Sequence, residues 1–482
     1  MNKKIIIIIL FVTVIVRLYH ILSPVGGWHS WRQADTAAIA RNFYDSGNNI
    51  LYPQIDWRGT TQGYVESEFH IYPYFISTIY NIFGVYDYFG RIISVIFSVF
   101  SVFGLYLIVR KTISERTALW AAFIFSILPL NIYFTRVFMP ESSMLMCSIF
   151  GIYFFLRWIE EDKLIHYLFA IVFVSLACLI KLPTLYIGLP LAFLAFNKFR
   201  WKMFIQWKII VMVIIVFAFV FLWYYHAHQL LKQTGLSFSI WNVGEDKWGM
   251  IGILLKPNFY NDIFIRTIGE RHLTYAGFVI FVWGLFIKRE YSYEMLFDYY
   301  LVSVIIFILI APQAHQAQEY YQLPFNIPAS VFIAKVFSKY ISFKEYKVRF
   351  LSNKLALSVV TLALILIPVL SFLRMANFMK SENSDSPIYK LSSEVRNTIP
   401  KNDLIVTVSN GNPVYLYLSE RKGWTAFTGI ISKEYIEKIK SEGADYIIGE
   451  KPDFKDCPDK LDIILKNNEN IINNEKYFIV KL

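Results

Sequence analysis

Long apolar runs separated by short polar segments occupy the chain up to about residue 376. A helix needs about 20 apolar residues to cross a bilayer, and roughly 17 to 25 are tolerated. The runs have about this length, so we predict about eleven membrane-spanning helices. The segment 73–86 is too short and too polar at its end to cross, and we expect an interfacial helix there. The predicted spans are 5–22, 88–109, 116–134, 142–158, 165–181, 184–197, 208–226, 273–288, 295–312, 323–337 and 355–373.

The basic residues between these runs predict the orientation of the chain. Lys and Arg gather in alternate short loops, which indicates that those loops and the N-terminus face the cytoplasm. Two long loops, 23–72 and 227–272, and the C-terminal region then lie outside. The first apolar run lacks a small-residue cleavage site, so we expect it to be retained as a span rather than removed. The basic residues of the inner loops include Arg110, Lys111, Arg116, Lys198, Arg200, Lys202, Lys208, Lys288, Arg289, Lys339, Lys344, Lys347, Arg349 and Lys354.

The composition changes after the last run, where Lys, Asp, Glu and Asn become frequent. We therefore predict a membrane domain over 1–376 and a small extracytoplasmic α/β domain over 377–482, large enough for a modest core. Short apolar stretches and amphipathic patterns carry this prediction. The expected strands are 404–408, 446–449 and 477–480, and the expected helices are 387–398 and 432–442.

Composition supports a membrane protein and excludes other classes. Hydrophobic residues make up 56% and charged residues 17% of the 482 residues, and the mean hydropathy is +0.44. A soluble chain carries about a quarter charged residues. The net charge of +11 reflects loop lysines, and no nucleic-acid-binding module accompanies it. The three cysteines are far apart, so they predict no disulfide framework and no metal knuckle.

The first long outer loop carries the strongest candidate for chemistry. Loops of about 50 residues between spans are unusual and tend to be functional. Asp35 lies at the start of a helical pattern within this loop. Taken alone, it could simply charge the first turn of a helix. Glu66 and Glu68, near the end of the loop, could likewise be ordinary solvated acids.

Further ionisable residues on the same predicted face shift this balance. Any one of them could merely extend from a span end to the interface. Together they supply carboxylates for acid–base chemistry and cations for an anionic substrate. These residues are Arg136, Glu141, Lys181, His315, Glu319, Tyr320 and Tyr321.

Several motifs in chain order resemble those of GT-C glycosyltransferases. They are Trp-Arg-Gln-Ala-Asp, Glu-Phe-His-Ile-Tyr-Pro, Arg-x-x-x-Pro-Glu and Glu-Tyr-Tyr-x-Leu-Pro. The branch that the chain resembles is the bacterial one related to protein O-mannosyltransferases and the lipid A aminoarabinose transferase. The resemblance spans roughly residues 1–373 and implies an all-α polytopic membrane bundle with interfacial helices in the first outer loop. The C-terminal domain matches no motif of the family.

The resemblance also implies roles for individual residues. Asp35 matches the catalytic base, and Glu141 matches the second acidic position. Glu68 matches an acid linked to metal or substrate contacts in some relatives. Lys181 and Tyr321 match residues of the lipid-phosphate pocket. Phe69 and His70 depart from the aminoarabinose branch, which has Lys after the Glu, so the donor sugar stays open; Arg58 or His70 could replace that cation.

These residues predict an inverting glycosyltransferase that uses a polyprenyl-phosphate-linked sugar donor. Asp35 would deprotonate an acceptor hydroxyl. Lys181, Arg136, Arg266 or Arg271 and the Tyr321 hydroxyl would stabilise the leaving phosphate, with Tyr320 and His315 as further candidates for that pocket. We expect a bacterial cytoplasmic-membrane location and an envelope lipid, glycan or protein as acceptor. No nucleotide-binding loop is present, and no cofactor is required.

Two other functions and a metal site are alternatives that the sequence leaves open. A lipid-linked glycan transporter would carry ionisable groups near the bilayer midplane and often a repeat. An O-antigen ligase or polymerase would carry a large Arg- and His-rich loop late in the chain. A divalent metal could be held by residues of the outer face, although their spacing fits no recognised metal pattern. These residues are Glu66, Glu68, His70, His29 and His315.

Overall fold

The computed structural model describes residues 2–237, 251–341, 354–379, 386–466 and 468–482. They form two compact units. Unit 1 comprises Met1–Ile21, Ile92–Tyr224 and Asn242–Met379, and unit 2 comprises Leu22–Arg91, Tyr225–Trp241 and Lys380–Leu482. The division predicted at residue 377 stays a prediction, while the contacts group the C-terminal region with the first long loop. Part of the predicted loop 227–272 lies outside the described residues.

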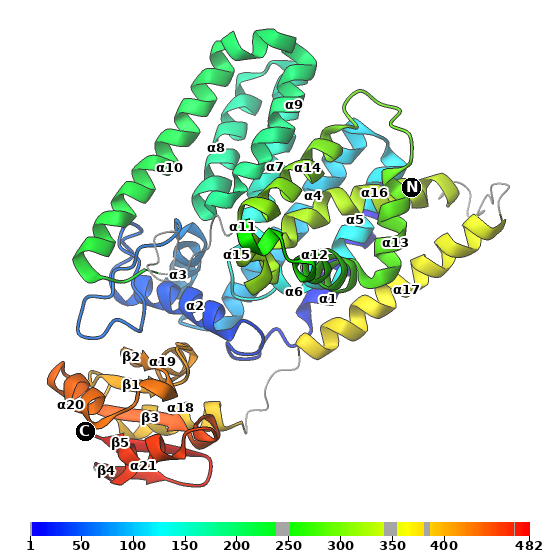
Figure 1. Cartoon of the computed structure of the whole chain (residues 1–482). Coiled ribbons are helices and arrows are strands. Elements are labelled where there is room, and N and C mark those ends of the chain that lie inside the picture. The colour runs from blue at the N-terminus through cyan, green and yellow to red at the C-terminus, as the bar shows by residue number, and fades with distance from the viewer. Residues whose placement is uncertain (1, 238–250, 342–353, 380–385, 467) are drawn as a thin grey trace. The chain divides into compact units, whose positions relative to one another are not determined.

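Unit 1 is helical, and each predicted span coincides with helix (Figure 1). Among the described residues, five helices are long and apolar enough to cross a membrane, and Leu164–Ile180, Thr274–Leu285 and Leu296–Ile310 are shorter apolar helices. The helices over the predicted spans are α1 (Asn2–Leu18), α4 (Asp87–Thr112), α5 (Glu115–Ile127), α6 (Pro129–Phe134), α7 (Glu141–Glu161), α8 (Leu164–Ile180), α9 (Gly188–Phe199), α10 (Trp207–Thr234), α13 (Thr274–Leu285), α14 (Leu296–Ile310), α16 (Asn326–Tyr340) and α17 (Lys354–Phe378).

Short helical pieces connect these long helices. They are η1 (Leu182–Ile187), η2 (Arg200–Ile205), α11 (Ile251–Leu254), α12 (Pro257–Tyr260), the π-helix η3 (Asn261–His272), α15 (Pro312–Ala317) and η4 (Glu319–Phe325). π-Helical turns are rare and are frequent at functional sites.

Close packing between the helices relies on small residues. α7 packs along α8, and α16 packs against α5 and α13. A Cβ at Gly284 of α13 would collide with the carbonyl of Phe332 in α16, so only glycine allows this approach. In a bilayer the hydrophobic effect does not favour contact between helices, because lipid tails are equally apolar. Small residues at helix interfaces instead let the backbones approach closely and gain van der Waals contacts.

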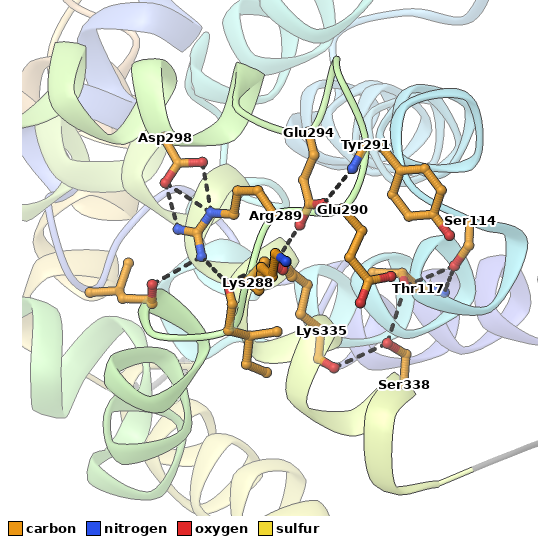
Figure 2. Close-up of polar contacts among 12 residues, drawn as sticks. Ser114, Thr117, Lys288, Arg289, Glu290, Tyr291, Glu294, Asp298, Lys335 and Ser338 are labelled. Carbon is orange, nitrogen blue, oxygen red and sulfur yellow. Dashed lines mark hydrogen bonds and ion pairs between the residues drawn. The ribbon is translucent and has the colours of Figure 1, made fainter.

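An ion-pair network holds the loop between α13 and α14 (Figure 2). The Glu294 carboxylate accepts the backbone N–H of Glu290 at 2.7 Å and pairs with Lys335 of α16. Arg289 donates hydrogen bonds from its Nε and Nη2 to the carboxylate of Asp298 in α14. Glu294 and Lys335 are buried, so each charge depends on its partner. The network therefore ties this predicted inner loop to two helices.

Unit 2 contains two helices from the first third of the chain and an α/β domain at its end. The helices are α2 (Ser30–Asp45) and α3 (Ile71–Phe83), which overlaps the predicted interfacial segment. The C-terminal domain is a five-stranded sheet in the order β2-β1-β3-β5-β4. Its strands are β1 (Ile405–Val408), β2 (Gly423–Ala426), β3 (Tyr446–Glu450), β4 (Glu469–Asn473) and β5 (Tyr477–Lys481).

The sheet is parallel at one side and antiparallel at the other. β1 pairs in parallel with β2 and β3, with Ile405 opposite Gly423 and Tyr446. β5 runs antiparallel to both β3 and β4. Helices cover both faces, which explains why β1 is buried along its whole length and β3 along all but its last residue. The helices are α18 (Pro387–Thr398), α19 (Val414–Ser419), α20 (Lys433–Ser441) and α21 (Pro458–Lys466).

The two faces of the sheet have separate hydrophobic cores, because successive strand residues point to opposite sides. We call the core under α18 and α19 the inner core; it contains Leu391, Ile405, Leu416 and Ile448, and Trp57 of the first loop packs against it. We call the core under α20 and α21 the outer core. It contains Val406, Ile439, Ile447 and Phe478, and Trp424 packs against it.

Candidate active site

Asp35 lies in the second turn of α2 and is only 3% exposed. The indole N–H of Trp57 donates a hydrogen bond of 2.9 Å to its Oδ1. Burial raises the pKa of the Asp35 carboxyl to about 7, against the opposing effects of Arg32 and of the Trp57 hydrogen bond. A carboxyl with a pKa near neutrality is suited to act as a general base. Trp57 gives the only hydrogen bond to this carboxylate from the described residues.

The other predicted residues of the first loop already have partners within unit 2. Glu68 forms a buried ion pair with Arg32 of α2. Glu66 accepts a hydrogen bond from the Ser237 hydroxyl. The His70 ring lies 2.5 Å from the Ser67 hydroxyl, and burial lowers the pKa of His70 to about 3. His70 is therefore neutral at physiological pH and does not replace a cation.

Arg58 lies apart from Asp35, at a cavity of about 650 Å³ within unit 2. Its Nη1 donates to the carbonyl of Gln62 at 3.2 Å. The cavity wall mixes cations and carboxylates from α2, the first loop, the start of α4, α18, the turn before β1 and the segment after α19. Its charged residues are Arg41, Asp45, Arg58, Asp87, Arg396, Lys401, Asp403, Glu420 and Lys422.

In unit 1, Glu141 and Lys181 form a buried ion pair. Glu141 is the first residue of α7, where the helix dipole favours a negative charge. Lys181 follows α8 in extended conformation. Its ammonium lies 4.4 Å from the ring centre of Tyr320 and 5.3 Å from that of Tyr321. The structure thus brings four of the predicted residues into one cluster.

Other predicted residues surround this cluster or are used elsewhere. His315 is 1% exposed and lies 5.8 Å, centre to centre, from the ring of Tyr321. Burial lowers the pKa of His315 to about 3, so the ring is neutral. Arg271 of η3 pairs with Glu319. Arg136 donates to the carbonyls of Arg17 and Tyr19 at the end of α1, at 3.1 and 2.5 Å.

Arg266 is directed to its own helix. It pairs with Asp262 one turn earlier, at 3.3 Å, and its side chain is 67% exposed. Of the residues predicted for the leaving phosphate, Lys181 and Tyr321 therefore lie in one cluster, while Arg136, Arg266 and Arg271 have other partners. Among the described residues no group of three or more His, Cys, Asp or Glu could hold a metal ion.

Sequence reasoning missed several residues of these sites. Arg32 stood within the quoted Trp-Arg-Gln-Ala-Asp motif, but its pairing with Glu68 had no sequence signal. Trp57 is separated from Asp35 by 22 positions and belongs to no motif. The Nδ1 of His272, in the π-helix η3, donates to the amide oxygen of Asn326 at 3.1 Å, and no sequence motif marks this pair.

The fold, with several long apolar helices, is that of a multi-pass membrane protein. A family model for dolichyl-phosphate-mannose-protein mannosyltransferase matches residues 70–225, about a third of the chain. No curated protein sequence matches.

Solved structures show the same fold over almost the whole chain. ArnT from Cupriavidus metallidurans bound to undecaprenyl phosphate has 11% identity and a TM-score of 0.65, covering 100% of this chain and 97% of that chain. The oligosaccharyltransferase AglB from Archaeoglobus fulgidus, in complex with an inhibitory peptide and a dolichol-phosphate, has 13% identity and a TM-score of 0.63. That match covers 93% of this chain and 69% of AglB. The resemblance to GT-C glycosyltransferases is thereby confirmed.

Proposed function

We propose that the protein is an inverting glycosyltransferase that moves a sugar from a polyprenyl-phosphate donor to an acceptor hydroxyl outside the cytoplasm. The observation that carries the proposal is the buried Asp35, whose pKa of about 7 suits a general base. The bound lipid phosphates named for the ArnT and AglB structures support the class of donor. The acceptor is an envelope lipid, glycan or protein.

In the proposed reaction Asp35 takes the proton of the acceptor hydroxyl. The acceptor oxygen then forms a bond to the anomeric carbon, while the bond from that carbon to the phosphate oxygen breaks. The lipid phosphate leaves with the electron pair. One direct displacement inverts the configuration of the anomeric carbon, because attack and departure occur on opposite faces.

The cluster of unit 1 fits the leaving phosphate. Negative charge grows on the phosphate oxygens during departure, so a cation and a hydroxyl donor stabilise the transition state. Lys181 supplies the ammonium group, and Tyr321 of η4 supplies a hydroxyl. Glu141 holds Lys181 in place through their ion pair and in this proposal acts through it rather than on the sugar.

The test compares sugar transfer by wild-type and Asp35→Asn membranes, using a total polyprenyl-phosphate sugar fraction as donor. Loss of a general base lowers rates by about 10²- to 10⁴-fold. Asp45→Asn is the matched control, because Asp45 is exposed at the end of the same helix. Full transfer by a folded Asp35→Asn variant would refute the proposal, and NMR of the product tests inversion.

The orientation of the chain needs its own test. A reporter that is active only outside the cytoplasm, fused after Leu482, should be active in cells. Activity of a cytoplasm-only reporter at the same position would contradict the proposed topology.

A further inference from the structure

We infer that the C-terminal domain takes part in catalysis, because Trp57 connects its inner core to Asp35. Trp57 is then a positioning residue for the base, and the C-terminal domain holds Trp57. This inference rests on the proposed function, since it takes Asp35 as the base. All of the residues involved lie within unit 2.

The two ends of the Trp57 side chain have different partners. The ring packs against the inner core of the C-terminal domain, which is built from α18, α19 and the facing strand residues. It also packs against a small cluster in the first loop that includes Ile39 and Ile55. The indole N–H donates to Asp35 at 2.9 Å. A single side chain therefore joins an apolar core to a carboxylate.

The backbone on both sides of Trp57 is bonded to the edge of the sheet. Gly423 N–H, at the start of β2, donates to the Asp56 carbonyl at 3.0 Å, and Gly59 N–H donates to the Gly423 carbonyl at 2.7 Å. The segment 56–59 thus covers the edge strand, which would otherwise leave backbone groups open. Trp57 lies between these two bonds and has little freedom to move.

A buried charge cluster fixes the same segment. The Asp56 carboxylate is 1% exposed and pairs with Arg41 of α2 at 2.6 Å and with Lys422 of the C-terminal domain. Arg41 also donates to the Tyr417 carbonyl of α19 at 2.9 Å. These contacts connect the helix that carries Asp35, the segment that carries Trp57 and the C-terminal domain. Buried pairs of this kind are strongly destabilised when one partner is removed.

The hydrogen bond from Trp57 has a direct effect on the base. A donor to a carboxylate favours the charged form and lowers its pKa, which opposes the effect of burial on Asp35. Without the donor, the pKa of Asp35 should rise by about one to two units, because a hydrogen bond to a charged group is typically this strong. The base would then be protonated at neutral pH.

The experiment measures the pH dependence of transfer by the full-length chain with the polyprenyl-phosphate sugar fraction. Trp57→Phe keeps a ring for the inner core and removes the donor. We expect the acid limb to move up by about one to two pH units, with a loss of about 10- to 100-fold below the new midpoint and recovery at high pH. The donor phosphate titrates in every variant, so a difference between variants reports on the enzyme.

Trp57→His is the rescue variant. The imidazole Nε2 takes the place of the indole Nε1, while the part of the ring that fills the core is lost. We expect the acid limb to return to the wild-type position or below, even if the variant is less stable. This pair of variants separates the donor from the packing.

Substitutions on opposite faces of the sheet test whether the C-terminal domain acts on Asp35 through its inner core. Leu416→Ala, in the inner core, should move the acid limb in the same direction as Trp57→Phe. Ile439→Ala, in the outer core, disturbs the same domain on the face of the sheet away from Trp57 and should leave the profile in place. Both are buried apolar residues, which makes the comparison fair.

The outcomes distinguish the two proposals. If Asp35→Asn retains full transfer, the base assignment fails and the inference fails with it. If Asp35→Asn is inactive but Trp57→Phe only lowers the rate equally at every pH, Trp57 is a structural residue and the inference alone is wrong. Equal shifts from inner-core and outer-core substitutions would also overturn it.

Discussion

Replacing Asp35 by Asn should make the protein more stable while it removes activity. The wild-type carboxyl has a pKa of about 7 in the fold and an ordinary value of 3.8. The folded state therefore keeps its proton up to about pH 7, while the unfolded state releases it above about pH 4. Stability from this group is present below pH 4 and is lost as pH rises to 7. The Asn side chain does not titrate and avoids this loss.

The size of the stabilisation by Asp35→Asn follows from the shift in the pKa of Asp35. A difference of about three units corresponds to roughly 4 kcal/mol at 1.36 kcal/mol per unit, as an upper value at pH 7 and above. The Asn oxygen can still accept the hydrogen bond from Trp57, so the substitution removes charge and little else. At about 2–4 °C per kcal/mol for a unit of this size, the gain in Tm is roughly 8–16 °C at most.

The assay is thermal unfolding of the purified full-length chain in detergent at pH 5 and pH 8. The difference in Tm between Asp35→Asn and wild type should be small at pH 5 and larger at pH 8. Asp45→Asn should show no such trend, since Asp45 is exposed. A difference that is the same at both pH values would refute the claim that the Asp35 carboxyl is desolvated in the fold.

Three further substitutions test unit 1. Lys181→Met leaves Glu141 buried without its partner, so we expect a loss of about 3–5 kcal/mol; adding Glu141→Gln should restore thermal stability but not sugar transfer. Tyr321→Phe removes one hydroxyl donor to a charged group and should lower kcat/KM for the donor by about 10- to 100-fold, with an unchanged Tm. Lys335→Met breaks the buried pair with Glu294 and should lower the free energy of unfolding by a similar amount, while KM for the donor stays the same. Recovery of Tm on adding Glu294→Gln checks this prediction.

The helices could be predicted because burial and bilayer length impose a regular apolar pattern. The helix expected at 387–398 matches α18 (Pro387–Thr398), since Pro is favoured at a first helical turn and the apolar residues recur at helical spacing. β2 and β4 were missed. β2 contains Gly and is short, and β4 is an exposed, Asn-rich edge strand, so neither has the alternation that marks a half-buried strand.

The types of site residue could be predicted, but their partners could not. A carboxylate in a long loop after a span is visible in the sequence as Asp35. Its pKa depends on burial and on Trp57, and neither follows from spacing. Arg136 and Lys181 look alike in the sequence as cations at span ends. The fold gives Arg136 backbone carbonyls and gives Lys181 a carboxylate and two rings, which separates their roles.

The burial of α2 explains why a domain without motifs matters to the base. Every residue from Arg32 to Phe43 is buried, although many are polar, and a helix of this composition would ordinarily be solvated. Polar groups are buried only where partners satisfy them. Several of these partners belong to the C-terminal domain, as the bond from Arg41 to the Tyr417 carbonyl shows. The same burial raises the pKa of Asp35. A change in the C-terminal domain should therefore alter the chemistry of the loop through the solvation of one carboxylate.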